Sequence, residues 1–321
     1  QVVVAPCGVM DQMSSSLGER DELMALLCRP ASLGSPIPLP RGFRLWGVDS
    51  GVAHAVGGSD YGTVRTAAFM GRALLNSHIN KVGLTPLGYL AELSPQELAA
   101  LPPLPEALDG ASFLKEVSAD GGADGANAHG DVATTIDARR RYAVRACATH
   151  PIEEHERVGR FASVLRKTQM RLGAAKLKEL GALMYQSHAS YSKCGLGADA
   201  TDRIVELVKE AGPRAHLYGA KITGGGCGGT VCILGRDSPR AQRSLERIII
   251  RYAHEAQRFG VPSGQVPLIF SGSSMGAANF GALRVSFEDD VERGAATRLQ
   301  ARLRGNSARK LTGGKSTKRK G

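Results

Sequence analysis

A run of glycines between two apolar segments places the strongest constraint on the fold of this chain. Residues 219–234 read GAKITGGGCGGTVCIL, and the run consists of Gly224, Gly225, Gly226, Gly228 and Gly229. The spacing GxGxxG is present, but a dinucleotide-binding loop is followed by a helix, whereas TVCIL predicts a strand. The ending of a Walker A loop is missing as well. The sequence therefore predicts strand, glycine loop, strand, and the loop either brings backbone N–H groups close to a phosphate or forms a tight hairpin.

A second segment, residues 5–16, surrounds one acid with small and apolar residues. It reads APCGVMDQMSSS, and Asp11 lies between Met10 and Met13. A carboxylate with apolar neighbours can work as a general base, and Gly8 lets a substrate approach the backbone closely. The alternative is that Asp11 is an acid at a helix N-terminus, where the helix dipole favours it. The residues alone leave both interpretations open.

Hydrophobic periodicity predicts both strands and helices in the rest of the chain. We expect strands at 43–49 and 266–270, and helices at 64–75, from Pro151 onward, at 170–188 and at 238–257. The proline-rich segment 84–114 predicts one short helix. This mixture predicts an α+β fold, for which the 42% hydrophobic content supplies a core.

Tyr61 is a candidate substrate contact just before the helix expected at 64–75. A tyrosine offers a flat apolar face and a hydroxyl tip, which suits a sugar ring. The alternative is a packed tyrosine with Arg65 extending past it.

The net charge of +11 is not spread evenly over the chain. Residues 293–321 hold 10 Lys and Arg and no Asp or Glu, so the remaining residues carry 11 − 10 = +1. We therefore expect residues 291–321 to form a basic disordered tail that can bind polyanions weakly, with no specific nucleic-acid partner. The glycine- and alanine-rich residues 118–131 are expected to form a flexible insertion.

Cysteine and histidine positions argue against a structural metal site and against a disulfide framework. The six cysteines form no CxxC pair, and none has zinc-site spacing with a histidine. Scattered thiols without a secretory signal are typical of a cytoplasmic protein. Because no run of 18 apolar residues occurs, we expect no membrane span.

Two motifs together resemble the C-terminal part of the GHMP small-molecule kinase superfamily, in its galactokinase and L-arabinokinase branch. PCGVMDQM at 6–13 is similar to the PCG[IV]MDQ segment of that branch, and KITGGGCGG at 221–229 is similar to its KxTGGGxGG motif. The motifs occur in the family's order, and SHAS at 187–190 adds to the similarity. The resemblance extends from residue 4 to about residue 285.

The resemblance implies a fold and a domain division. Residues 1–58 would finish an incomplete, ribosomal-S5-like N-terminal domain, and 59–290 would form the ferredoxin-like C-terminal domain. Strands at 2–4 and 43–48 would then lack sheet partners, so we expect exposed apolar surface there.

The resemblance also implies an activity, namely ATP-dependent transfer of a phosphoryl group to the C1 hydroxyl of L-arabinose or D-galactose. Asp11 would be the base, Gly8 and Tyr61 would contact the sugar, and the five glycines of the run would lie beside the nucleotide phosphates. ATP and Mg²⁺ are the implied cofactors, and a sugar and ATP the implied partners. The family's sugar-binding motif and phosphate loop do not occur in this sequence, and we expect them to precede Gln1.

Two other classes of function remain open. A non-catalytic sugar-binding or sensor protein would keep part of the sugar pocket without turnover. A polyanion-binding protein would act through the basic tail, although that tail has no interleaved aromatic residues.

Overall fold

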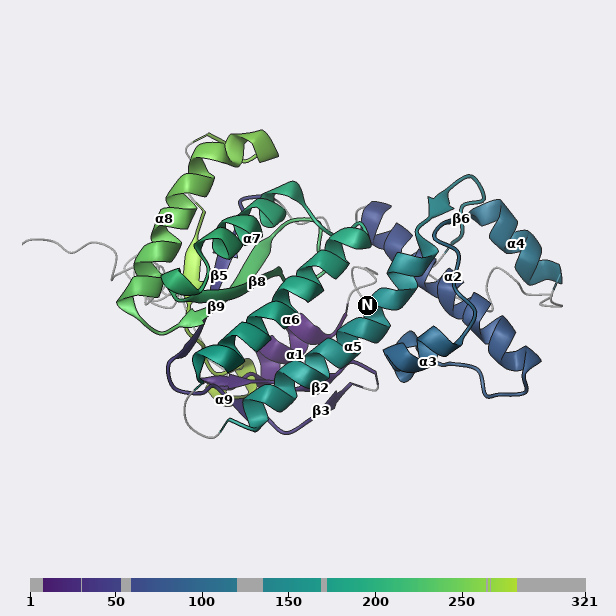
Figure 1. The fold of residues 1–321 in the computed structure, drawn as a ribbon, viewed down its shortest axis with the longest axis horizontal. Coiled ribbons are helices and arrows are strands. Elements are labelled where there is room, and N and C mark those ends of the chain that lie inside the picture. Colours follow the sequence, from purple (N-terminus) through teal and green to yellow (C-terminus); the bar gives the residue numbers. More distant parts are fainter. Residues whose placement is uncertain are drawn as a thin grey trace, which may run out of the picture.

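The computed structural model describes residues 8–29, 31–52, 59–119, 135–168, 172–263, 265 and 267–281. These residues form a four-stranded sheet, long helices that cover it, and a helical extension at one end (Figure 1). The expected α+β fold is confirmed, and the expected strand, glycine loop and strand are present as β8 (Leu217–Ile222), the loop, and β9 (Thr230–Arg236).

The sheet is antiparallel in the order β10-β5-β9-β8. Strand β5 (Phe43–Asp49) pairs with β9 along its whole length, and β10 (Ile269–Ser271) pairs with the other edge of β5. The expectation that residues 43–48 lack sheet partners is therefore wrong. Trp46 and Val48 are buried, because this alternating segment finds a partner strand far along the chain.

Both faces of the sheet are covered, because alternate residues of each strand belong to different apolar clusters. Trp46, Val231 and Ile233 pack with α7 (Asp199–Ala211) and α8 (Pro239–Glu255). Phe43 and Leu234 pack with the helices on the other face, α5 (Val144–Arg166) and α6 (Ala174–Lys193). The helix expected at 238–257 is confirmed as α8, with Leu245, Ile248, Ile249 and Tyr252 buried.

Helix α5 begins earlier than expected, at Val144, and Pro151 lies inside it. Proline lacks the N–H that would bond to the carbonyl four residues earlier, which is why it favours a prediction of a helix start. Here the helix continues through Pro151 because α5 packs along both α2 (Ser59–Lys81) and α6.

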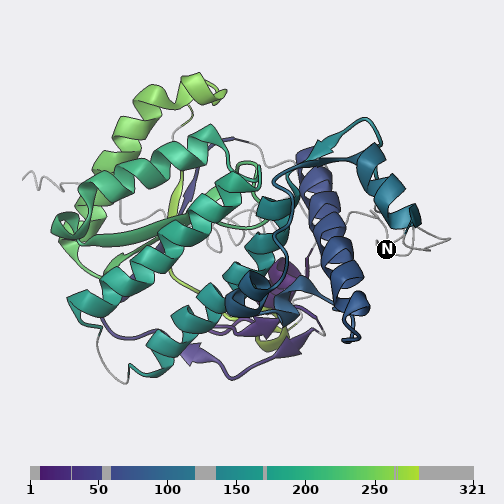
Figure 2. The same ribbon diagram turned by 45° about the vertical axis from the view of Figure 1, so that its right-hand side comes forward.

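The helical extension lies at the end of the molecule opposite α8, as both views show (Figure 2). It contains α2, η1 (Leu90–Glu92), α3 (Pro95–Ala100) and α4 (Gly110–Ala119), with the short pair β6 (Leu108–Asp109) and β7 (Arg141–Tyr142). The expectation of one helix in 84–114 is met by α3, where Ser94 and Glu97 form a capping box. The start of α4 was not predicted.

The N-terminal part consists of one helix and two short ribbons that pack beside the sheet. Helix α1 (Met10–Leu17) contacts α9 (Ala277–Phe280). The ribbons pair β1 (Glu22–Leu23) with β4 (Ile37–Pro38) and β2 (Leu26–Leu27) with β3 (Ser32–Leu33).

Several expectations lie outside the described residues. These are the strand at 2–4, most of the insertion at 118–131, and the tail at 291–321. Residues 118 and 119 are described, and they belong to α4. The domain boundary at residue 58 stays a prediction. No helix in the described ranges is long and apolar enough to cross a bilayer.

Candidate functional site

The loop between β8 and β9 has a backbone that only a glycine-rich sequence adopts readily. Gly224, Gly226, Gly228 and Gly229 have φ angles of 74°, 85°, 113° and 79°, in the left-handed region that side chains disfavour. Cys227 has a positive φ of 59° as well. The clustering of glycines in the sequence therefore follows from the shape of this loop.

The loop is fixed by backbone hydrogen bonds to other segments. The Cys227 N–H donates to the Leu196 carbonyl at 2.8 Å, and the Gly229 N–H donates to the Val52 carbonyl at 3.1 Å. A Cβ on Gly226 would lie 2.5 Å from the Leu196 oxygen, so no larger residue fits without movement. The loop is thus held between the segment after α6 and the segment after β5.

Several N–H groups of the loop have no acceptor in the part of the chain that the structure describes. They belong to Gly224, Gly225, Gly226 and Gly228. Consecutive N–H groups in such conformations form concave sites that favour anions. This chemistry fits phosphate oxygens, and a phosphate-binding role for the loop stays a prediction.

A polar network that joins α5, α6 and β8 supports the start of the loop. The Tyr191 hydroxyl donates to the Gly224 carbonyl at 3.1 Å, and the Lys221 ammonium lies 5.2 Å from the centre of the Tyr191 ring. Lys221 is also 3.9 Å from a carboxylate oxygen of Glu154. The network links the loop to two helices that cover the sheet.

Glu154 remains charged although it is largely buried. Burial opposes the charge, but hydrogen bonds from Ser187 (2.5 Å) and Arg157 (2.8 Å) and the charge of Lys221 keep the pKa of Glu154 below its usual range. Burial, together with the charge of Glu154, raises the pKa of Tyr191 to about 12, so its hydroxyl stays a hydrogen-bond donor.

The adjacent residues Ser187 and His188 do not form a catalytic pair. Ser187 bonds to Glu154, whereas the His188 ring accepts a hydrogen bond from the Ile222 N–H and contacts Asp202. This arrangement fits the rule that neighbouring residues on a helix face different directions.

Tyr61 is brought to the side of the glycine loop. It is half-buried on α2 and packs in the same apolar cluster as Tyr191 and Cys227. Its proximity also contributes to the raised pKa of Tyr191. Two regions that are far apart in sequence therefore meet here, and the role of Tyr61 toward a sugar stays a prediction.

Asp11 and Gly8 are placed differently from what their sequence neighbours suggested. Both are exposed, and Asp11 lies in the first turn of α1. The expectation of an acid surrounded by apolar side chains is wrong, because the short helix turns this carboxylate to solvent. Within the described residues, no hydrogen bond or ion pair joins Asp11 to Tyr61 or the glycine loop. Its position agrees with the alternative interpretation, a helix N-terminal acid, and its role as base stays a prediction.

Sequence reasoning missed Glu154, Tyr191 and Lys221. Lys221 stands in the quoted motif and gave a signal, but the other two come from separate helices and have no local pattern. Among the described residues, no group of three or more His, Cys, Asp or Glu is placed to hold a metal ion.

The comparisons with known proteins place the glycine loop within a known domain family. Residues 172–254, which include α6, α7, the glycine loop and most of α8, match the family model described as GHMP kinases C terminal. The chain therefore contains a GHMP kinase C-terminal domain, which agrees with the resemblance seen in the glycine motif, whereas the motif at 6–13 lies outside the matched residues.

Individual relatives narrow the similarity to the sugar-kinase branch. L-arabinokinase of Arabidopsis thaliana is 41% identical over 318 residues, covering 88% of this chain and 29% of that protein. Galactokinases of Chloroflexus aggregans and Glaesserella parasuis are 27% and 26% identical over 71% and 76% of this chain. The chain spans 46% and 50% of these two enzymes, so it matches half or less of each relative.

The fold is galactokinase-like. The crystal structure of Lactococcus lactis galactokinase complexed with galactose matches 84% of this chain and 55% of that chain, with a TM-score of 0.55 and 18% identity.

Proposed function

We propose that this chain acts in ATP-dependent phosphorylation of a sugar at its C1 hydroxyl. The observation that carries the proposal is the 41% identity to an L-arabinokinase over 88% of the chain. This similarity exceeds that to the galactokinases, so L-arabinose is the favoured substrate and D-galactose the second.

In this proposal the residues near α1 and α2 handle the sugar. Asp11 accepts the proton of the C1 hydroxyl or orients that hydroxyl for attack, and its exposure leaves it accessible to a substrate. Gly8 allows close approach of the sugar to the backbone, and Tyr61 offers its ring face.

The glycine loop would hold phosphate oxygens of ATP through its backbone N–H groups, supported by Tyr191 at Gly224. Mg²⁺ bound with ATP would neutralise phosphate charge. Positioning and charge neutralisation supply most of the acceleration in phosphoryl transfer, so a fixed loop matters more than a strong nucleophile. A cytoplasmic location stays a prediction from the cysteine pattern.

The test compares Asp11→Asn with Asp199→Asn in ATP-dependent phosphorylation of L-arabinose and D-galactose. Asp199 is also an exposed acid in the first turn of a helix, so both variants lose the same helix-dipole interaction. We expect the Asp11 variant to lose about 10²-fold or more in kcat, while the Asp199 variant keeps normal turnover.

The assay should use this chain and a version extended toward the length of its relatives. Full turnover in the Asp11 variant would remove that residue from the mechanism. Sugar binding without turnover in the unmodified protein would instead support the non-catalytic sensor.

A further inference from the structure

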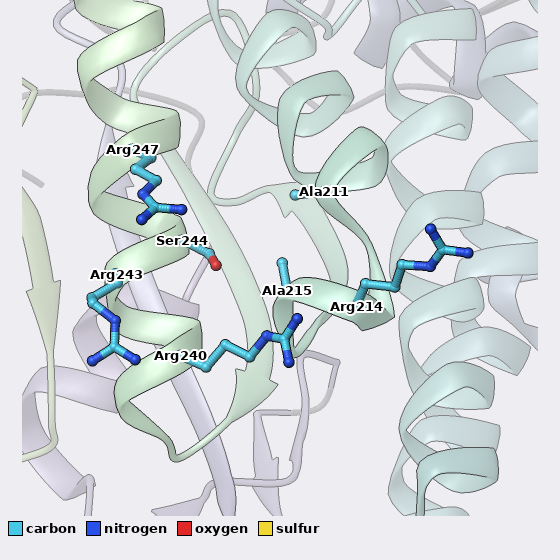
Figure 3. Close-up of a pocket in the computed structure, with 7 residues that line it drawn as sticks. All are labelled: Ala211, Arg214, Ala215, Arg240, Arg243, Ser244 and Arg247. Atoms are coloured by element: carbon cyan, nitrogen blue, oxygen red, sulfur yellow. The ribbon is translucent and has the colours of Figure 1, made fainter.

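Exposed arginines line a pocket at the start of β8, whereas the glycine loop follows the other end of that strand. The pocket has a volume of about 500 Å³ and lies between the first half of α8 and η2 (Pro213–Ala215). Its lining includes Arg214, Arg240, Arg243 and Arg247, together with Ser244 and two alanines. In Figure 3, Arg240 and Arg247 extend from α8 toward η2 with the Ser244 hydroxyl between them, whereas Arg243 and Arg214 point away from the space between the two elements.

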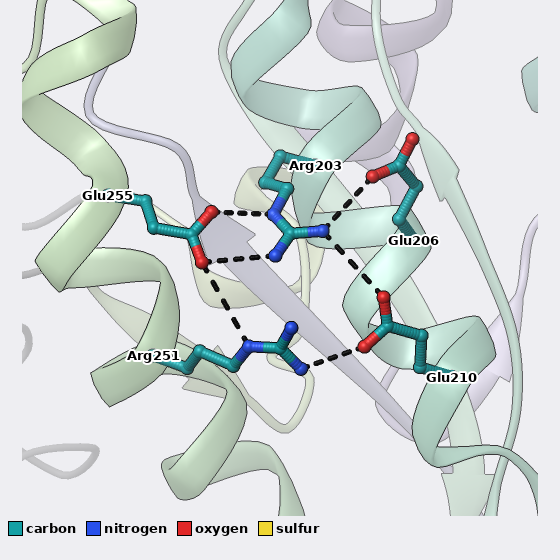
Figure 4. Close-up of polar contacts among 5 residues, drawn as sticks. All are labelled: Arg203, Glu206, Glu210, Arg251 and Glu255. Carbon is teal, nitrogen blue, oxygen red and sulfur yellow. Dashed lines mark hydrogen bonds and ion pairs between the residues drawn. The ribbon is translucent and has the colours of Figure 1, made fainter.

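None of these four arginines has an ion-pair partner among the described residues. Elsewhere on α8, and on the neighbouring helix α7, arginines are paired with acids. There, Arg203 and Arg251 bond to Glu206, Glu210 and Glu255 (Figure 4). Glu206, Glu210 and Glu255 are therefore engaged with Arg203 and Arg251, and no ion pair among the described residues compensates the four arginines of the pocket.

The position of these arginines on α8 opposes helix stability. Arg240 is the second residue of the helix, Arg243 follows within the next turn, and no acid occupies the first turn. The N-terminus of a helix carries a partial positive charge, which disfavours cations there. Because the helix dipole argues against this pattern, a ligand that benefits from concentrated positive charge explains it better than helix stability does.

The spacing of the arginines indicates the form of that ligand. Arg240, Ser244 and Arg247 occur at i, i+4 and i+7, which places them on one face of the helix. Seven residues correspond to about 10 Å along an α-helix, so an anion with several phosphate groups in a row can engage both guanidinium groups at once. The guanidinium fork matches phosphate oxygens in a bidentate manner.

The lining also limits the ligand. It contains no acid, no aromatic ring and no large aliphatic side chain. A nucleobase would lack an aromatic stacking partner, and a peptide would lack a pocket for an apolar anchor. We propose that this pocket binds a linear chain of phosphate groups, such as inorganic oligophosphate or the triphosphate of a nucleotide, at a site separate from the one proposed for catalysis.

The test measures binding of inorganic tripolyphosphate by calorimetry to the unmodified protein, to Arg240→Gln/Arg247→Gln and to Arg139→Gln/Arg140→Gln. The control pair is exposed beside β7 in the helical extension, so it removes the same charge from the other end of the molecule. This control is needed because residues 293–321 also carry 10 basic residues. We expect the pocket variant to bind about tenfold more weakly or worse, and the control pair to bind normally.

His216 provides a local readout that does not depend on a variant. It follows η2 directly, and burial together with the charges of Arg240 and Arg236 holds its pKa below the usual range. Tripolyphosphate in the pocket should raise the pKa of His216 in an NMR titration, whereas binding to the tail should leave it unchanged.

The two sources of the phosphate chain are separated by comparing tripolyphosphate with ATP. Because ATP also binds at the site proposed for catalysis, both ligands are compared through the shift in the pKa of His216. Saturation of that shift at a lower concentration of tripolyphosphate assigns the free chain, and saturation at a lower concentration of ATP assigns the nucleotide. The proposal is overturned if inorganic phosphate binds as tightly as tripolyphosphate, if an oligoglutamate peptide binds more tightly, if both double variants lose binding equally, or if His216 does not respond.

Discussion

Two glycines of the same loop have different reasons to be glycine. Gly224 and Gly226 both have positive φ angles, of 74° and 85°. A Cβ on Gly224 would meet open space, whereas one on Gly226 would lie 2.5 Å from the Leu196 carbonyl oxygen. The first glycine is needed for backbone conformation alone, and the second for conformation and close approach.

We expect Gly224→Ala to lower the free energy of unfolding by about 1–2 kcal/mol through the left-handed backbone. Gly226→Ala should lower it by about 1 kcal/mol or more beyond that, because the loop must move away from Leu196. Urea unfolding of both variants measures the difference. If both variants lose the same free energy of unfolding, the close approach of Gly226 to Leu196 contributes nothing to the cost of the substitution.

The Tyr191 hydroxyl should matter for nucleotide binding more than for stability. Tyr191→Phe removes the hydrogen bond to the Gly224 carbonyl, for which we expect a loss of about 1 kcal/mol in unfolding free energy. Because the loop then loses a support, the KM for ATP should rise severalfold in the active protein.

Tyr185→Phe is the matched control for this experiment. Tyr185 lies on the same helix and is partly buried, but its hydroxyl has no hydrogen-bond partner among the described residues. An equal rise in KM for both variants would show that the effect does not pass through Gly224.

At the scale of residues, the sequence predicted the glycine loop but not the side chains that hold it in place. The φ angles of the loop follow from residue type, since glycine alone adopts them freely. The contacts among Glu154, Lys221 and Tyr191 depend on how three elements pack, and nothing in their local sequence encodes a distance. For the same reason the sequence around Asp11 could not show that α1 exposes this acid.

Helices α7 and α8 are joined by charge as well as by apolar contact. Glu255 accepts two hydrogen bonds from Arg203, at 2.7 and 3.0 Å, and Arg251 bonds to Glu210 at 2.7 Å. The bond from Arg203 holds the pKa of Glu255 below its ordinary value of 4.5, although burial opposes the shift. The ion pair between Arg203 and Glu255 therefore makes the free energy of unfolding depend on the charge of Glu255.

The stability contributed by Glu255 should be lost in acid. A carboxyl whose pKa is lower in the folded state stabilises fully above its unfolded value, and this contribution disappears as the pH falls through the folded value. Stability curves measured from pH 7 downward should therefore fall below about pH 4.5. In Glu255→Gln this part of the fall should be absent.

Glu116→Gln serves as the control, because Glu116 is exposed on α4 and has no partner in the described ranges. The loss of stability of this variant between pH 7 and acid pH should match that of the unmodified protein. If Glu255→Gln also matches it, the ion pairs of Figure 4 are not linked to folding.

Elements with a clear apolar stripe were predicted well, and α5 shows the limit. The stripe of α8 identified its buried residues correctly. For α5 the local preference of Pro151 pointed to a helix start, but packing on both sides outweighed the missing hydrogen bond. Tertiary packing therefore determined where α5 begins, and such packing cannot be predicted from the sequence of one segment.

At the scale of the whole molecule, strand β5, which precedes the boundary expected at residue 58, belongs to the same sheet as β8, β9 and β10. A chain that begins at residue 59 would leave β9 and β10 without the strand between them. We expect such a chain to lack a cooperative unfolding transition by calorimetry, while a chain that begins at residue 41 keeps one. Cooperative unfolding of residues 59–321 alone would support the boundary expected at residue 58.

Net charge conceals the distribution of charge over the fold. Residues before 293 sum to +1, which suggested a neutral body. In the structure the acids gather around Arg203 and Arg251, and four arginines stand together elsewhere. A sum over the sequence cannot report such segregation, because it depends on which helix faces meet.

The pairing of β5 with β9 has a consequence for synthesis on the ribosome. The last residue of β5 and the first residue of its partner, Asp49 and Thr230, are 230 − 49 = 181 positions apart. At 5–20 residues per second, translation takes roughly 10–35 s to cover that interval. During that time an apolar strand has emerged without its hydrogen-bonding partner, so the nascent chain is a natural client for a chaperone that shields unpaired strands.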